Sequence, residues 1–216
     1  MTLLVGVYGA GGAGRGVMPL VRSWARNEGP ERVFIDDQAS VEINGHRVLT
    51  FEAFLEEPAD EKRVVVAIAN SRIRETIVAR CEAAGVGFFI AKAGNVEIMD
   101  DVTIGEGAIL SPFVTLTSNI RIGRHFQANH YSYVEHDCVI GDFVTFAPAV
   151  RCNGNIVIED HAYIGTGAVL KQGLPNAPLV IGRGAVVGMG AVVTKNVPPG
   201  VTVIGNPARP LTKTRA

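Results

Sequence analysis

Residues 133–146 read YVEHDCVIGDFVTF, and within them Val134, Ile140 and Phe146 stand six positions apart. A six-residue unit is the length of one short strand plus one corner, and three such units close one triangular coil. Sixteen units occur, which predicts about five coils of a parallel β-solenoid. The anchor residues of these units are Ile98, Ile104, Leu110, Leu116, Ile122, Ala128, Val134, Ile140, Phe146, Cys152, Ile158, Ile164, Leu170, Ile181, Val187 and Val193.

Glycine follows many of the anchors, and the period is interrupted once. We expect these glycines to mark corners where the chain needs an unusual φ. The interruption lies between Leu170 and Ile181, where five extra residues predict a loop extruded at one corner. The glycines are Gly105, Gly123, Gly141, Gly165, Gly182 and Gly188.

A different pattern precedes the six-residue units. Short apolar runs alternate with longer amphipathic ones, as LLVGVY, VMPLVRSWARN, RVFID, VVVAIA and RETIVARCEAAG. This alternation predicts βαβ units with a parallel sheet. We therefore expect a small Rossmann-like α/β domain over residues 1–92 and the β-solenoid over residues 93–216.

The first predicted strand ends in a glycine-rich turn, Gly9 to Gly14, that leads into a helix. Free N–H groups at such a helix start can meet a phosphate. Asp36 and Asp37 follow the second strand, which completes the pattern of a dinucleotide site. Because the chain ahead of the repeats has room for only half of such a site, we favour contact with a nucleotide or sugar nucleotide. A turn kept for packing and a nicotinamide-dependent dehydrogenase are the alternatives.

Composition excludes several classes of partner. The 216 residues carry a formal net charge of −1, so there is no basic field for nucleic acid or an anionic membrane. No run approaches the roughly 20 apolar residues of a membrane span. The three cysteines have no CxxC spacing, which favours a reducing compartment and buried thiols over disulfides. We expect a cytoplasmic protein.

The order of these parts resembles one known family over nearly the whole chain. The GAGG turn, FIDD, VVVAIANSRIR and a repeat region containing VEHDCVIG resemble hexapeptide-repeat acetyltransferases of nucleotide-linked sugars, of the sialic-acid O-acetyltransferase and UDP-4-amino-sugar N-acetyltransferase type. The resemblance implies a left-handed β-helix, a homotrimer, and acetyl-coenzyme A as co-substrate with no metal.

The same resemblance implies a reaction. It is N-acetylation of a nucleotide-linked 4-amino-4,6-dideoxy sugar for bacterial polysaccharide or lipopolysaccharide synthesis, with the nucleotide base left open. O-acetylation of a sugar such as sialic acid is an alternative, and a nucleotide-sugar-binding module without catalysis is another.

The candidate catalytic residues are Glu135, His136 and Asp137, at a corner of the solenoid. An imidazole with a pKa near 6.5 can accept a proton from an attacking amine at neutral pH. A solvated turn is the alternative for such a cluster. The resemblance makes His136 the general base and Asp137 its orienting acid, with Glu135 as a substitute. At Thr145 the sequence departs from members that carry a second histidine, so no relay through that position is expected.

Most of the binding residues come from the resemblance, position by position. In the β-helix it implies that Asn129 lies near the acceptor sugar. It places Gly154 where coenzyme A approaches the backbone, with a plain corner glycine as the alternative, and Gly165 is a further cofactor candidate. Lys195, Arg183 and Arg209 are candidates from their charge alone, as cations for the phosphates of the coenzyme. The expected acceptor residues in the N-terminal domain are Gly9, Ala10, Gly11, Gly12, Asp36, Asp37, Asn70, Ser71 and Arg72.

The remaining histidines offer a competing site. His125, His130 and His161 suggest a zinc centre, because three imidazoles leaving one position open would bind a catalytic zinc ion. Their spacing and the N-terminal domain both argue against the zinc enzymes of this fold. His46 lies in NGHR, which reads as a solvated loop.

Overall fold

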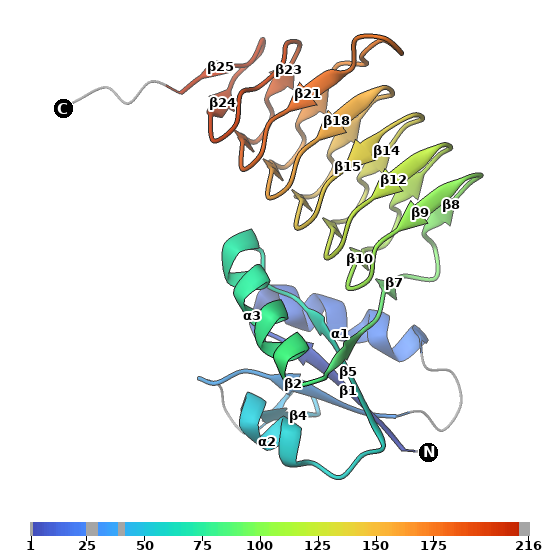
Figure 1. The fold of residues 1–216 in the computed structure, drawn as a ribbon, viewed down its shortest axis with the longest axis vertical. Coiled ribbons are helices and arrows are strands. Elements are labelled where there is room, and N and C mark those ends of the chain that lie inside the picture. The colour runs from blue at the N-terminus through green and yellow to red at the C-terminus, as the bar shows by residue number, and fades with distance from the viewer. Residues whose placement is uncertain (1, 25–29, 39–41, 212–216) are drawn as a thin grey trace, which may run out of the picture. The chain divides into compact units, whose positions relative to one another are not determined.

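The computed structural model describes residues 2–24, 30–38 and 42–211, and the chain forms two compact units. One unit comprises Met1–Gly94 with Glu106–Ile109, and the other comprises Asn95–Gly105 with Leu110–Ala216. The predicted combination of an α/β domain and a left-handed β-helix is confirmed (Figure 1). The boundary between residues 92 and 93 stays a prediction.

The first unit is built around a mixed sheet with the strand order β3-β4-β2-β1-β5-β6, in which all neighbouring strands run parallel except β3 and β4. Its central strands are rich in valine and isoleucine because they are buried on both faces, and Val5, Phe34 and Val65 are 0% exposed. The bounds are β1 (Leu3–Tyr8), α1 (Gly12–Trp24), β2 (Glu31–Ile35), β5 (Glu61–Val66), α3 (Ser71–Ala83) and β6 (Gly87–Phe88).

The sequence interpretation missed three short elements between β2 and β5. They are the hairpin β3 (Glu42–Ile43) with β4 (His46–Leu49), and the helix α2 (Phe51–Glu56). The hairpin turn is Asn44-Gly45, both in the left-handed region, which is the pair that a two-residue hairpin turn favours. The solvated-loop interpretation of His46 was wrong, because its ring packs edge-on against Phe34 with centroids 5.9 Å apart.

In the second unit, short strands stack coil upon coil into three parallel sheets (Figure 1). Val134 pairs with Leu116 on one side and Cys152 on the other, so each residue meets the one 18 positions away. One sheet holds β8 (Glu97–Ile98), β11 (Thr115–Leu116), β14 (Tyr133–Val134), β17 (Arg151–Cys152), β20 (Val169–Leu170) and β23 (Val192–Val193). The second holds β9 (Val102–Ile104), β12 (Ile120–Ile122), β15 (Val139–Ile140), β18 (Ile156–Ile158) and β21 (Leu179–Ile181).

The third sheet runs to the last strands of the chain. Its members are β7 (Ala91–Lys92), β10 (Ile109–Leu110), β13 (Gln127–Ala128), β16 (Thr145–Phe146), β19 (Tyr163–Ile164), β22 (Val186–Val187), β24 (Thr202–Ile204) and β25 (Arg209–Pro210). β25 pairs with β24 in the antiparallel sense, which ends the stack. No helix within the described ranges is long and apolar enough to cross a membrane.

The six-residue period is the pattern of the buried core. From Leu110 to Val193, every anchor is at most 5% exposed. The first anchor, Ile98, is 38% exposed because its strand β8 forms the edge of its sheet. Cys81, Cys138 and Cys152 are buried free thiols, as expected from their number and spacing.

The five extra residues form the predicted loop, between β20 and β21. Within it, Leu174 and Ala177 pair with each other through their main chains. The strand register survives the insertion, because Leu170 pairs with Val193 just as Cys152 pairs with Leu170. The loop therefore changes the length of one coil without disturbing its neighbours.

Candidate functional site

From Asp101 to Gly190, the corners of the β-helix carry a regular series of left-handed residues, each three positions after an anchor. At the corner that follows β8, β11, β14 and β17 they are Asp101, Asn119, Asp137 and Asn155, with φ between 54° and 58°. Asp and Asn tolerate this region better than most residues. The expectation that the glycines directly after the anchors supply the unusual φ was wrong, because none of them has positive φ. They are needed for space, since a Cβ on Gly105 would lie 2.6 Å from the carbonyl carbon of Gly123.

His136 lies at this corner, between β14 and Cys138, and its ring contacts the side chain of Asp137. The distance from His136 Nδ1 to Asp137 Oδ2 is 2.7 Å, and the two side chains are 44% and 48% exposed. Asn119, one coil earlier, donates from Nδ2 to Asp137 Oδ1 at 3.2 Å. The hydrogen bond from His136, and then that from Asn119, lowers the pKa of Asp137, which therefore carries its charge at neutral pH.

Gly154 lies against the face of the His136 ring, one coil later in the same column. A Cβ added to Gly154 would stand 2.5 Å from His136 Cε1 and 2.6 Å from Nε2, which is closer than real Cβ contacts allow. Glycine is therefore required here if the ring is to keep its position. This role was missed from the sequence, which assigned Gly154 to the cofactor alone.

Glu135 holds the corner through its main chain, where its N–H donates to the carbonyl of Cys152 at 2.8 Å. The ring contact of His136 is made by Asp137 instead. An imidazole that donates from Nδ1 to a carboxylate leaves Nε2 as a free base. The arrangement can thus accept a proton at an exposed position.

Asn129 occupies a different corner, after β13. Its Nδ2 donates to the carbonyl of Phe146 at 2.8 Å. The strand β14 separates it from the His136 corner, so one chain does not bring Asn129 and His136 together. Thr145 is 3% exposed in β16, so it does not present its side chain to solvent.

The predicted cofactor residues differ in what surrounds them. Gly165 is packed against the next coil, since a Cβ there would lie 2.6 Å from the main-chain nitrogen of Met189. Lys195 is exposed and, with Arg209, lines a cavity of about 210 Å³ near the end of the chain. Arg183 pairs with Asp160 at 2.8 Å.

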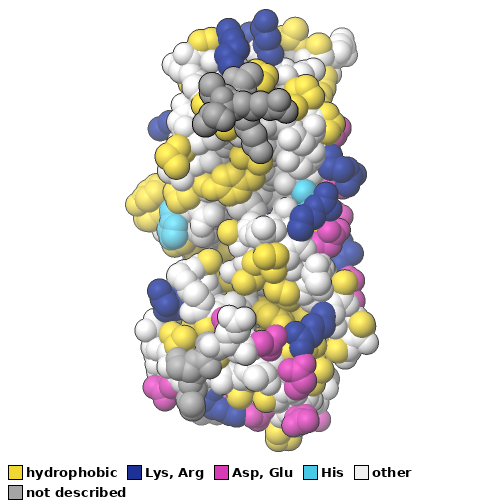
Figure 2. Space-filling view, turned by 90° about the vertical axis from the view of Figure 1, so that its left-hand side faces the viewer, with side chains coloured by type: hydrophobic (Ala, Val, Ile, Leu, Met, Phe, Trp, Pro, Cys, Tyr) yellow, Lys and Arg dark blue, Asp and Glu magenta, His cyan; other side chains and the backbone are white. Residues whose placement is uncertain are grey.

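Charges of both signs are present on the face of the molecule that Figure 2 presents. Figure 2 shows Lys, Arg, Asp and Glu side chains intermingled on the face that it presents, with hydrophobic side chains in separate patches. This distribution agrees with the net charge of −1 and favours small-molecule ligands over polyanions.

The glycine-rich turn of the first unit combines packed and open positions. Gly9 has φ +102° and donates to the carbonyl of Ile35 at 2.7 Å. A Cβ on Gly14 would lie 1.7 Å from Gly9 O, so α1 can start close to β1 only with glycine there. Gly11 and Gly12 are exposed, and a Cβ added to either would meet nothing within 4 Å, which leaves this part of the turn open to a ligand. Ala10 is buried.

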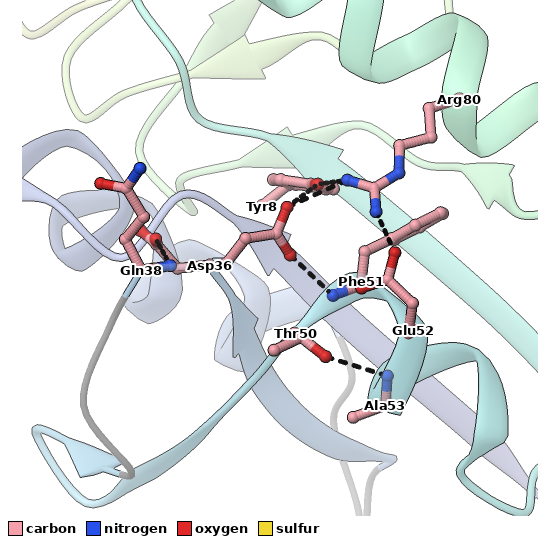
Figure 3. Close-up of polar contacts among 9 residues, drawn as sticks. Tyr8, Asp36, Gln38, Thr50, Phe51, Glu52, Ala53 and Arg80 are labelled. Atoms are coloured by element: carbon pink, nitrogen blue, oxygen red, sulfur yellow. Dashed lines mark hydrogen bonds and ion pairs between the residues drawn. The ribbon is translucent and has the colours of Figure 1, made fainter.

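Asp36 and Asp37 are held by contacts that the sequence did not predict. Figure 3 shows the nearby network in which Arg80 contacts Tyr8 and Glu52. Asp36 accepts from the main-chain N–H of Ala10 at 3.0 Å, which ties it to the glycine-rich turn. Asp37 accepts from Phe51 N–H and from Arg80, both at 3.0 Å. Both carboxylates therefore organise the domain in addition to any role toward a ligand.

Arg80 is the centre of this second network and was missed from the sequence. Its guanidinium donates to Tyr8 Oη at 2.8 Å, pairs with Glu52, and lies 4.4 Å above the ring of Phe51. Burial, followed by the charge of Asp37, raises the pKa of Tyr8 to about 12, so the phenol stays protonated. No motif in the sequence marks this arginine, because its partners come from distant parts of the chain.

The charge of Asp37 is expected to stabilise the first unit in a pH-dependent way. The hydrogen bond from Phe51 N–H is the main influence that lowers its pKa from 3.8, so the stabilisation is complete above that value and is lost as the pH falls through the lowered one. At neutral pH, Asp37→Asn should reduce the free energy of unfolding by less than about 1 kcal/mol, because the group is exposed. Urea unfolding at neutral pH and below about pH 4 should show the difference shrinking with acid; a constant difference would contradict it.

Asn70 and Arg72 lie at the start of α3. Asn70 Oδ1 caps the helix by accepting from the N–H groups of Arg72 and Ile73 at 3.0 and 3.1 Å. Ser71 is the first residue of the helix. The side chain of Arg72 is 62% exposed and pairs with Glu75 at 3.3 Å, a weak surface contact that a phosphate can displace.

The zinc alternative is not supported by the positions of the histidines. His125 and His161 are buried with the ring of Phe143 stacked between them, at centroid distances of 5.2 and 5.3 Å. His130 is at a different corner. Across the part of the chain that the structure describes, no group of three or more His, Cys, Asp and Glu side chains is placed to hold a metal ion.

Known proteins resemble this chain in both sequence and fold. The family model described as the PglD N-terminal domain matches residues 5–81. A GDP-perosamine N-acetyltransferase from Escherichia coli O157:H7 is 51% identical over 215 residues, covering 98% of this chain and 97% of the relative. The solved structure of WeeI from Acinetobacter baumannii AYE aligns with a TM-score of 0.95 and 59% identity, over 97% of this chain and all (100%) of that one.

A further solved structure contains a ligand. It is the acetyltransferase domain of PglB from Neisseria gonorrhoeae FA1090 in complex with acetyl coenzyme A. It aligns with a TM-score of 0.88 and 29% identity, over 98% of this chain and 100% of that one.

Proposed function

Because this chain belongs to the PglD-type family of hexapeptide-repeat nucleotide-sugar N-acetyltransferases, we propose that it transfers the acetyl group of acetyl-coenzyme A to the amine of GDP-perosamine. The observation that carries the proposal is 51% identity to a GDP-perosamine N-acetyltransferase over nearly the full length of both chains. Perosamine is an amino-dideoxy sugar, the class of acceptor expected from the sequence. N-transfer is thereby favoured over O-acetylation of sialic acid and over a binding module.

His136 is the proposed general base. The neutral amine of the sugar attacks the thioester carbonyl, a nitrogen–carbon bond forms, and Nε2 of His136 takes the proton that the nitrogen loses. Asp137, which is charged, holds Nδ1–H and stabilises the imidazolium. When the carbon–sulfur bond breaks, His136 returns the proton to the departing thiolate. No covalent enzyme intermediate is needed.

The diphosphate of the acceptor is proposed to bind at the glycine-rich turn. Gly11 and Gly12 are open at the start of α1, where main-chain N–H groups and the helix dipole favour an anion. Ala10 and Asp36 keep the turn in shape, and Arg72 offers an exposed cation at the start of α3. Asp37 supports this domain through Arg80.

A homotrimer is proposed because the hexapeptide-repeat family associates as parallel trimers, and the positions of Asn129 and His136 agree with a site shared between copies. The two residues occupy different corners of one coil. If both reach the same acceptor, they must come from two copies of the chain, with acetyl-coenzyme A in the groove between them. Light scattering on the purified protein would test this, and a monomer or a dimer would contradict it.

Lys195 is proposed to meet the phosphates of coenzyme A at the cavity that it lines with Arg209. Lys195→Ala should raise the KM for acetyl-coenzyme A by about 3- to 10-fold with kcat unchanged, because one exposed charge–phosphate contact is lost. Lys195→Arg keeps the charge and should remain close to the wild type. Steady-state kinetics check this, and an unchanged KM in the alanine variant would remove Lys195 from the cofactor site.

The reaction is tested by measuring release of coenzyme A thiol from acetyl-coenzyme A. The acceptors are GDP-perosamine, UDP- and dTDP-linked 4-amino-4,6-dideoxy sugars, and free sialic acid. We expect turnover with GDP-perosamine and an acetamido product by mass spectrometry. Preference for another nucleotide would reject the guanosine assignment, and turnover on sialic acid alone would reject N-transfer.

A further inference from the structure

Asn119 contacts the carboxylate that orients the proposed base. Its Nδ2 donates to Asp137 Oδ1 at 3.2 Å, while Asp137 Oδ2 lies 2.7 Å from His136 Nδ1. The two oxygens of one carboxylate are thus divided between two partners. Asn119 therefore does not contact the His136 ring itself but is bonded to the carboxylate that does.

The geometry of the coil brings these side chains together. Asn119 and Asp137 hold the same position in successive coils, with φ of 57° and 58°. The N–H of Asp137 also donates to the carbonyl of Ser118 at 3.1 Å, so the two corners are joined through the main chain as well. The side-chain contact is therefore built into the stacking of the coils.

An exposed aspartate needs such a second partner to keep one orientation. The terminal torsion of an aspartate side chain is broad, and Asp137 is 48% exposed, so water competes for its oxygens. A hydrogen bond to Oδ1 limits rotation of the carboxylate and keeps Oδ2 directed at His136. The proton on Nδ1 then stays in place, and Nε2 keeps its lone pair.

The same series of left-handed corner residues offers a contrast with the amide partner of Asp137. Asp101, one coil before Asn119, is held by Arg121, which donates to both carboxylate oxygens at 2.9 Å. That pairing neutralises the carboxylate and occupies both oxygens. A neutral amide at position 119 instead fixes one oxygen of Asp137 and leaves its negative charge available to the imidazolium that forms during transfer.

We propose that Asn119 is a positioning residue for acetyl transfer, which fixes Asp137 and through it the tautomer and orientation of His136. The inference rests on the proposed function of His136 as general base. Asn119 itself touches neither substrate in this mechanism, so its effect passes entirely through Asp137.

The test is the variant Asn119→Gly, because glycine adopts the left-handed φ without strain and removes only the amide. We expect kcat for GDP-perosamine to fall by about 3- to 10-fold with both KM values unchanged, as for loss of one hydrogen bond to a charged group. Asn44→Gly is the matched control, since Asn44 is a left-handed asparagine in the turn between β3 and β4 and should leave kcat unchanged.

A double-mutant cycle separates positioning from a general structural role. In an Asp137→Ala background, Asn119→Gly should change kcat by less than about twofold, because its partner is already gone. Nitrogen NMR of the imidazole should also show a larger Nε2-protonated fraction in Asn119→Gly than in the wild type.

The outcomes distinguish the two proposals. If Asp137→Ala and His136→Ala both keep normal kcat, the proposed base is wrong and this inference falls with it. If those variants lose activity but Asn119→Gly does not, only the positioning role is rejected. An equal loss in the wild-type and Asp137→Ala backgrounds would assign Asn119 to the fold instead.

Discussion

The His136→Ala variant is expected to lose acetyl transfer, with kcat reduced by about 10²- to 10⁴-fold, because no other group replaces the base. The nearest carboxylate, Asp137, has a lowered pKa and accepts protons poorly at neutral pH. The side chain of His136 is 44% exposed, so its removal should leave the fold and the melting temperature unchanged. Release of coenzyme A thiol under saturating substrates measures the effect.

Two controls accompany this variant. His46→Ala removes a histidine from β4 of the first unit, outside the proposed site, and should keep full activity. Calorimetric titration of His136→Ala with coenzyme A should give wild-type affinity, which separates the loss of the base from the loss of the cofactor. Turnover within tenfold of the wild type in His136→Ala would remove this residue as the base.

Gly154→Ala is expected to reduce kcat by about 10- to 100-fold, since misplacing a catalytic group by about 1 Å has effects of this size. The added methyl would overlap the imidazole of His136 at 2.5 Å, and the ring is the group that can move. Because Gly154 does not have positive φ, the substitution adds no backbone strain. The melting temperature should therefore stay near that of the wild type.

The kinetic pattern of Gly154→Ala also decides between two roles for this glycine. If it positions His136, kcat falls and the KM for acetyl-coenzyme A is unchanged. If it makes room for the cofactor, as the family resemblance implied, that KM rises and kcat at saturation is retained. Gly94→Ala is the matched control, because Gly94 has ordinary φ and nothing within 4 Å of its added Cβ.

The repeat itself was predictable because burial imposes it. From Leu110 onward the anchors lie in the core, and ahead of the extruded loop each pairs with the residue 18 positions away, so a change of period or polarity at Leu116 or Val134 would break the stack. The α/β domain was predictable for the same reason, through the valine-rich strands of its parallel sheet. Patterns that result from burial in a core can be recognised in a single sequence.

Contacts across coils were not predictable, since they depend on which side chains the stacking superimposes. Asn119 is 18 positions from Asp137, and Gly154 is 18 positions from His136, but without the exact register neither pair stands out. The register could be read from the anchors. The sequence did not show which residue of each unit adopts the left-handed conformation, because Asp, Asn, His, Phe, Tyr, Ala and Gly all occur at that position.

In the first unit, the sequence interpretation missed that side chains predicted to bind a ligand also make hydrogen bonds within the domain. Asp36 and Asp37 match a ligand-binding pattern, yet both accept hydrogen bonds from the protein's own main chain. Arg80, the partner of Asp37, lies 43 positions away in the chain. The Asn44-Gly45 hairpin was readable from its turn residues alone and was overlooked.

The extruded loop between β20 and β21 has a consequence for how such chains diversify. Strand pairing is the same on both sides of it, so added length at a corner is not transmitted along the stack. Each coil exchanges hydrogen bonds only with its immediate neighbours, which makes the domain close to a one-dimensional array. Insertions, deletions and loop grafts at the corners can therefore accumulate independently of one another. The strand register of the core stays the same while the corner loops, and the ligands they contact, change.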